Sequence, residues 1–279
     1  SQLLILRINM KNNTLLHIIG VTILLAACSN DNTQKAITPP VNADGIRLNV
    51  LAPANLSIPR PKPPFNLTGI WDFNHKWPEN QATGAFGRGY EFYPLPQLKP
   101  EAAALYAEKE KALAEGRTFR DDAGLCFPPG MPRLMTRVHP MMIMQYPTVI
   151  VMISGFDNSI RLINLDGRDH TEYDYLIPSY QGDSIGHWDG DALVIDTIGL
   201  EPERHWMQQG VPLSESLRIQ ERITVSEDGR SMTNEMTFTD PVNWEGEWKT
   251  TKYSRFSDTA EITEVNCIAA ITNEGIEGL

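Results

Sequence analysis

The sequence predicts a mainly β protein, folded as an antiparallel barrel or closed sandwich with one helix and a proline-rich loop insertion. Three observations predict this class. Seven segments after residue 146 have the length and composition of strands. Asp-Gly pairs, which suit hairpin turns because glycine accepts a positive φ, lie between or beside several of them. With so many strands in one domain, closing the sheet limits its open edges.

The elements follow in chain order. A strand should begin near Leu67, and residues 100–115 should form a helix, with proline in the first turn, Glu101 near the positive end and Gly116 just past the end. Residues 117–147, dense in proline and methionine, should be irregular and wrap a surface or cover an opening. Strands are then expected at 148–154, 160–165, 192–198, 217–225, 232–239, 247–256 and 261–267, with Asp-Gly turns at 166–167, 189–190 and 228–229.

The N-terminal segment resembles a bacterial lipoprotein signal. Met10 and Lys11 give a basic start, and residues 15–27 form an apolar run too short to span a bilayer, with small residues at its end. The resemblance implies cleavage before Cys28 and lipidation of that cysteine. The alternative is a buried N-terminal helix.

Three regions follow from this interpretation. Residues 1–27 are the predicted signal peptide, and an upstream mis-start would account for residues 1–9. Residues 28–64, rich in Asn, Thr, Ala and Pro, are the predicted flexible tether, and residues 65–279 the predicted single β-rich domain. The serine after Cys28 resembles the outer-membrane type of lipoprotein, which implies a lipid-anchored protein at the periplasmic face of that membrane.

Charge narrows the classes of partner. Removing the signal takes away Arg7 and Lys11 and leaves 22 basic against 35 acidic residues, a net charge of −13. Such a surface repels phosphate backbones, so no nucleic-acid partner is expected. Because no later run of eighteen apolar residues exists, the lipid would be the only membrane attachment.

Two cysteines remain once Cys28 carries lipid. In an oxidising envelope compartment, a disulfide between Cys126 and Cys267 is expected, and two unpaired buried thiols are the alternative. Neither cysteine has metal-ligand or redox spacing, and the histidines form no ligand motif, so no metal and no cofactor are expected.

The alternation of residues along the strands predicts that several polar side chains point into the interior. In residues 217–225, Glu221 shares a face with apolar residues, and the same parity places Arg161, Asn234 and Asp196 toward the interior. Unpaired burial of a charge costs several kcal/mol, so these groups either pair with one another as a structural network or line a wet pocket in which one acid has a raised pKa. For Asp196 the opposite parity, with residues 193, 195 and 197 inward, is also open.

Residues 184–191 contain a second candidate. Asp189-Gly190 suits a turn and Trp188 a packing anchor, which leaves His187 as the candidate proton-exchanging residue. No Gly-x-Ser-x-Gly elbow and no phosphate-binding glycine loop is present.

Several motifs resemble a group of uncharacterised envelope lipoproteins common in soil bacteria. The matching residues run from about 66 to 267 and include Leu67-Thr68-Gly69-Ile70-Trp71, Cys126-x-Pro128-Pro129-Gly130-Met131-Pro132-Arg133, Ser184-Ile185-Gly186-His187-Trp188-x-Gly190-Asp191 and Glu264-x-x-Cys267. The resemblance implies no established reaction, cofactor or substrate. Where relatives carry a histidine before Ser214, this chain has Leu213. Two Gly-x-Trp pairs also resemble the opening of lipocalin-type (calycin-like) barrels.

Three functions follow as hypotheses. The first is binding of a small, largely apolar molecule in a barrel pocket. The second is an enzyme in that pocket, in which His187, Glu221 or Asp196 exchanges protons. The third is a non-catalytic interaction protein that uses its acidic surface. The candidate ligand-binding residues are Arg161, Arg133, Asn234, His170 and His139.

Overall fold

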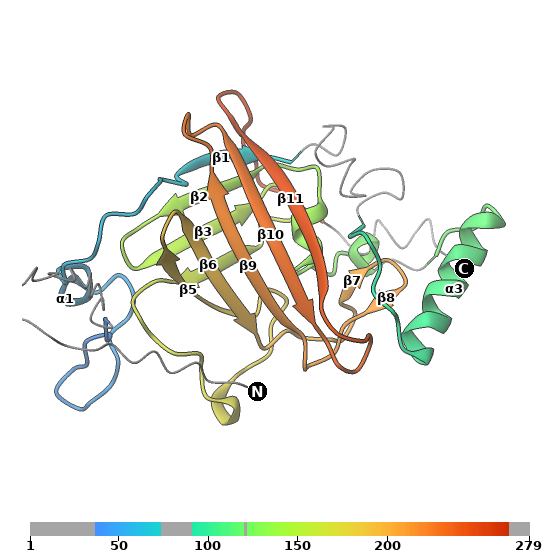
Figure 1. The fold of residues 1–279 in the computed structure, drawn as a ribbon, viewed down its shortest axis with the longest axis horizontal. Coiled ribbons are helices and arrows are strands. Elements are labelled where there is room, and N and C mark those ends of the chain that lie inside the picture. Colours follow the sequence, from blue (N-terminus) through green and yellow to red (C-terminus); the bar gives the residue numbers. More distant parts are fainter. Residues whose placement is uncertain (1–36, 74–90, 120–121, 268–279) are drawn as a thin grey trace, which may run out of the picture. The chain divides into compact units, whose positions relative to one another are not determined.

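Nine strands close into a barrel in the computed structural model, which describes residues 37–73, 91–119 and 122–267 (Figure 1). The fold class predicted from the sequence is therefore confirmed, in its barrel form. Around the barrel the strands follow the order β1 (Gly69–Asp72), β11 (Trp248–Ser257), β10 (Ser231–Thr239), β9 (Arg218–Val225), β6 (Ala192–Ile198), β5 (Asp183–Asp189), β4 (Ile160–Asn164), β3 (Val149–Ser154) and β2 (Met141–Gln145).

Smaller elements lie outside the barrel sheet. The predicted helix is confirmed as α3 (Pro100–Ala114), and β7 (Trp206–Gln208) pairs with β8 (Val211–Pro212) in a separate two-stranded sheet. The short helices are α1 (Pro53–Leu56), η1 (Asp122–Leu125), η2 (Arg133–Thr136) and η3 (Tyr173–Tyr175).

One strand pair departs from the antiparallel pattern. β4 and β5 run parallel and share only two residue pairs, Ile163 with Ser184 and Asn164 with Ile185. A parallel pair requires a crossover connection, so the expected hairpin turn at Asp166-Gly167 is wrong. The turns at 189–190 and 228–229 do join antiparallel neighbours, β5 with β6 and β9 with β10.

Three further expectations need correction. Residues 261–267 form no strand, because β11 already pairs with β10 and with β1. β2 lies inside the segment expected to be irregular, and β5 forms at 183–189, where no strand was expected.

The barrel interior is filled by side chains. Alternate residues of each long strand point inward, as in the buried set Ile219, Glu221 and Ile223 of β9. Phe92, which is fully buried, packs with ring centroids 5.0 Å from Phe238 and 6.1 Å from Trp248. The segment before α3 therefore seals this part of the core.

The predicted signal peptide, Cys28 and the first part of the predicted tether lie outside the described residues. Within the rest of that tether, Asn55 is fully buried and donates a 2.9 Å hydrogen bond to Asp166. Residue 55 is therefore part of the folded structure and not of a flexible tether. None of the helices in the described ranges has the length and apolarity needed to cross a bilayer.

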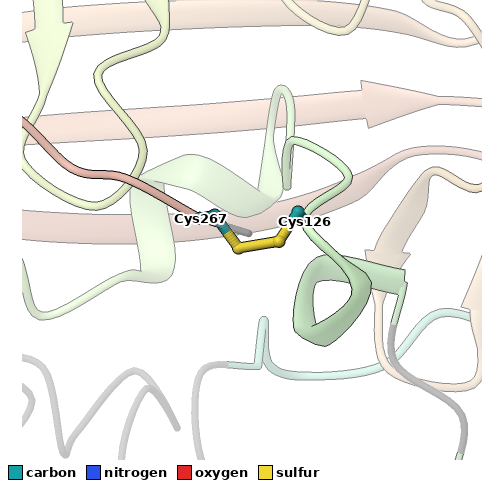
Figure 2. Close-up of a disulfide and its surroundings, with 2 residues drawn as sticks. All are labelled: Cys126 and Cys267. Carbon is teal, nitrogen blue, oxygen red and sulfur yellow. A yellow bond between two sulfur atoms is a disulfide. The ribbon is translucent and has the colours of Figure 1, made fainter. Parts of the chain in front are cut away.

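The predicted disulfide is present. Cys126 and Cys267 are bonded, with their Cα atoms 5.6 Å apart, and Figure 2 shows the bond joining the loop after η1 to the chain that follows β11. The bridge fastens the proline-rich loop to the C-terminal end of the described chain.

Candidate functional site

A buried ion pair lies at the centre of the predicted inward cluster. The guanidinium of Arg161 contacts the carboxylate of Glu221, with Nη1 3.3 Å from Oε1, and donates to Thr197 (3.0 Å) and Ser184 (3.3 Å). Asn234 donates a 2.8 Å hydrogen bond to the same carboxylate. The parity argument is therefore confirmed for Arg161, Glu221 and Asn234, which lie together on the inner face.

This cluster is closed to solvent. Arg161 is 1% exposed and Glu221 2%, and every oxygen of the carboxylate has a partner. A buried charge pair with its hydrogen bonds satisfied acts as a structural cross-link, and neither group is free to bind a ligand.

Asp196 lies on the opposite face, so its predicted inward orientation is wrong. Leu193, Ile195 and Thr197 are the buried residues of β6, as in the alternative parity. Outside the barrel, Asp196 accepts two 2.7 Å hydrogen bonds from Arg218, and its Oδ2 lies 3.0 Å from Nε2 of His170.

Those contacts set the acidity of Asp196. Burial alone raises the pKa of this carboxyl, but the hydrogen bonds from Arg218 and His170 outweigh it and hold the pKa below its ordinary value. The other ring nitrogen of His170 lies 3.3 Å from Asp183. The histidine therefore links the crossover loop, residues 165–182 between β4 and β5, to β5 and β6.

The remaining predicted residues are dispersed. His187 is exposed on the outer face of β5, and His139 is exposed with its ring 5.2 Å from that of Phe156. Arg133 is buried in η2. Only Arg161, Glu221 and Asn234 share one site, and His170 and Asp196 share another.

A cleft of about 800 Å³, which we call the outer cleft, lies on the outside of the barrel. It follows the outer faces of β5, β6, β9, β10 and β11, and Tyr93 and Pro94 lie at one side. Its lining carries hydroxyl, amide, imidazole and charged side chains together with the apolar Val194. The polar ones are chiefly those of His187, Gln220, Arg222, Glu235, Thr237, Lys249 and Thr251.

Charges in the outer cleft are largely compensated. Arg222 donates a 2.8 Å hydrogen bond to Asp189, which lowers the pKa of that carboxyl, and Lys249 lies 2.8 Å from Glu247. The hydroxyl of Tyr93 donates a 2.5 Å bond to buried Glu91, which fixes the ring at the edge of the cleft. Burial raises the pKa of Tyr93, so this hydroxyl stays protonated.

Of the residues that line the outer cleft, the sequence predicted His187 and Glu221 as site residues, and the carboxylate of Glu221 is bonded to Arg161 inside the barrel. The signal that could have located the others is the outward parity of neighbouring strands: Gln220, Thr237 and Thr251 are each one step from a buried residue. Tyr93 carries no such signal, since it lies in a loop. Across 37–73, 91–119 and 122–267, no group of three or more metal-ligating side chains comes together.

The chain matches no protein-family model, and no curated protein is similar to it in sequence. Among solved structures, a secretary abundant heat soluble (SAHS) protein from Ramazzottius varieornatus is 10% identical, with a TM-score of 0.31 over 71% of this chain and 98% of that chain. The barrel assignment comes from the strand pairing of the chain itself.

Proposed function

We propose that this protein is a non-catalytic, lipid-anchored binding protein of the cell envelope, whose small-molecule ligand occupies the outer cleft. The outer cleft supports this proposal, because its volume of about 800 Å³ lies in the range of small-molecule binding sites. The barrel serves as the rigid support on which the outward side chains are arranged.

The lining favours an uncharged ligand rich in hydroxyl groups, of the sugar class. Gln220, Thr237 and Thr251 offer both donors and acceptors, while Arg222 and Lys249 are already paired with acids. The fixed ring of Tyr93 offers an apolar surface against which the face of a sugar ring packs. This chemistry replaces the largely apolar ligand expected from the sequence.

Enzymatic chemistry has less support from the geometry. The carboxylate of Glu221 is bonded to Arg161 and Asn234, and that of Asp196 to Arg218 and His170, so neither acid is available to a substrate. His187 remains exposed in the outer cleft, where it serves the proposed site as a hydrogen-bonding residue.

Ligand binding is tested by screening purified protein against an array of neutral and charged oligosaccharides, followed by calorimetric titration. Thr237→Ala should weaken binding of a neutral hit several-fold, because one hydrogen-bonding group of the cleft is lost. Thr233→Ala changes the same residue type on the outer face of the same strand, outside the cleft lining, and should leave affinity unchanged. Equal affinities of the two variants would overturn the proposed site.

The anchor is tested separately. Cys28→Ala should release the protein from the membrane fraction into the soluble envelope fraction, because no lipid can then be attached. Retention of that variant in the membrane fraction would refute the lipid anchor and would leave the proposed cleft untouched.

A further inference from the structure

We propose a second binding site, for an extended basic peptide, at the parallel seam between β4 and β5. A groove of about 410 Å³ lies there, between the outer side chains Ile160 and Leu162 of β4 and residues 179–184. We call it the seam groove. It is separate from the outer cleft, and this inference does not rest on the function proposed above.

The seam is open because the two strands diverge. Pairing of β4 with β5 is limited to Ile163–Ser184 and Asn164–Ile185, and Ser179 instead forms a bridge with Leu200. The β4 residues before Ile163 pair with β3 on one side and have no strand partner in β5. A strand edge with free backbone groups accepts an extended peptide as an added strand.

The groove also holds an unused amide. Both the nitrogen and the oxygen of the Gln181 side chain are buried, and neither has a hydrogen-bond partner among the described residues. A buried amide without partners costs free energy unless a ligand or water satisfies it. Its paired donor and acceptor complement the N–H and C=O of a peptide unit.

Charge specifies which peptide fits. The crossover loop that runs directly into the groove exposes three carboxylates, those of Asp169, Glu172 and Asp174, none of which has an ion pair among the described residues. The same loop exposes Tyr173, Tyr175 and Ile177, the last by 85%. Acidic and aromatic side chains together complement lysine or arginine residues that alternate with apolar ones.

The loop is held in place before any partner arrives. His170 lies between Asp183 and Asp196, and the side chain of Leu176 packs against Gly199, where an added Cβ would lie 2.8 Å from it. A surface that is ordered beforehand loses less conformational freedom on binding.

The probe is a fluorescent eight-residue peptide that alternates lysine and valine, titrated against the whole protein by anisotropy. It should bind, and a matched peptide that alternates glutamate and valine should bind at least tenfold more weakly. N-methylation of every second backbone nitrogen removes backbone donors while keeping the side chains, and should abolish binding. Equal binding of the basic and acidic peptides, or insensitivity to N-methylation, would overturn the proposal.

Matched variants locate the site. Ile160→Asp should weaken binding tenfold or more, whereas Val242→Asp, which changes a side chain that is also 56% exposed, should not. Glu172→Gln should weaken binding by about two- to fivefold, as expected for one exposed ion pair, and Glu227→Gln should leave it unchanged.

A second copy of the chain is the rival occupant. Sedimentation tests for a dimer. If the protein is a dimer that the peptide does not dissociate, and if Ile160→Asp makes it monomeric, the groove is a self-association surface and the peptide proposal is wrong. Thr237→Ala in the outer cleft should leave peptide binding unchanged, so the two proposed sites fail or hold independently.

Discussion

The guanidinium of Arg161 on β4 binds the carboxylate of Glu221 on β9, across the two strands that separate them in the barrel order. Thr197 of β6 and Ser184 of β5, the intervening strands, each accept a hydrogen bond from the same guanidinium, and their hydroxyls are hydrogen-bonded to each other at 2.8 Å. This buried network therefore ties β4 to three other strands at the point where β4 and β5 share only two residue pairs.

Removing one charge of this network should destabilise the fold. Glu221→Gln keeps the side-chain shape but leaves Arg161 buried without a counter-charge, so the free energy of unfolding should fall by about 3–5 kcal/mol. Denaturant titration measures this free energy of unfolding. The double variant Arg161→Met with Glu221→Leu should recover most of the loss, because no charge is then buried. A Glu221→Gln protein as stable as the unchanged one would contradict a structural role.

Acid should destabilise the fold through His205, which is 3% exposed. Burial lowers the pKa of His205 to about 4, and the positive charge of Arg133 acts in the same direction. Between pH 6.5 and 4 the unfolded chain therefore binds a proton that the folded chain does not, and stability should fall by about 3 kcal/mol as pH falls through this range.

Unfolding free energies at several pH values test this expectation. His205→Asn keeps a donor for the carbonyl of Glu201, which lies 2.8 Å from Nδ1, and should lose the pH slope. His187→Gln, a change at an exposed histidine, should keep the pH slope of the unchanged protein. The same slope in all three proteins would show that other groups cause the dependence.

The sequence predicts the closed β architecture because period-two patterns and Asp-Gly turns are local signals. It also predicts the inward orientation of Arg161 and Glu221, since each is a charged residue that shares one face of its strand with apolar residues. The sequence does not predict β5, because Gly186, His187 and the flanking acids lack the alternating apolar pattern of a strand, and pairing with β6 makes that stretch a strand.

Non-local contacts explain the other errors. Either parity of β6 was locally reasonable, and the choice was made by Arg218 and His170, which hold Asp196 outside the barrel. The outer cleft joins side chains from five strands and a loop, so its composition depends on the strand order. That order includes a parallel pair, which no turn signal in the sequence indicates.

Reducing the disulfide should lower stability strongly. Cys126 and Cys267 are 141 residues apart in the chain, and a chain-entropy argument gives about 5 kcal/mol for a loop of this order. Cys126→Ser with Cys267→Ser should reproduce the effect of a reducing agent on the free energy of unfolding, and the reducing agent should have no further effect on that variant. Two free thiols in natively purified protein, found by mass shift after alkylation, would contradict the bridge.

The buried amine of Lys252 should make the fold more stable in alkali. This side chain points into the barrel, donates a 3.1 Å hydrogen bond to the carbonyl oxygen of Glu91, and lies 4.7 Å from the centre of the Phe92 ring. Burial lowers its pKa from 10.5 to about 7. Between these values the unfolded chain binds a proton that the folded chain lacks, so stability should rise with pH by roughly 5 kcal/mol, while below pH 7 the folded protein bears the full cost of a buried charge. Lys252→Met should remove this rise and should be more stable than the unchanged protein at pH 6. Lys252→Arg, whose charge cannot be lost, should be the least stable of the three proteins at pH 9. If Lys252→Met has the same dependence on pH as the unchanged protein, the amine is charged in the folded state throughout this range and the interpretation of its burial is wrong.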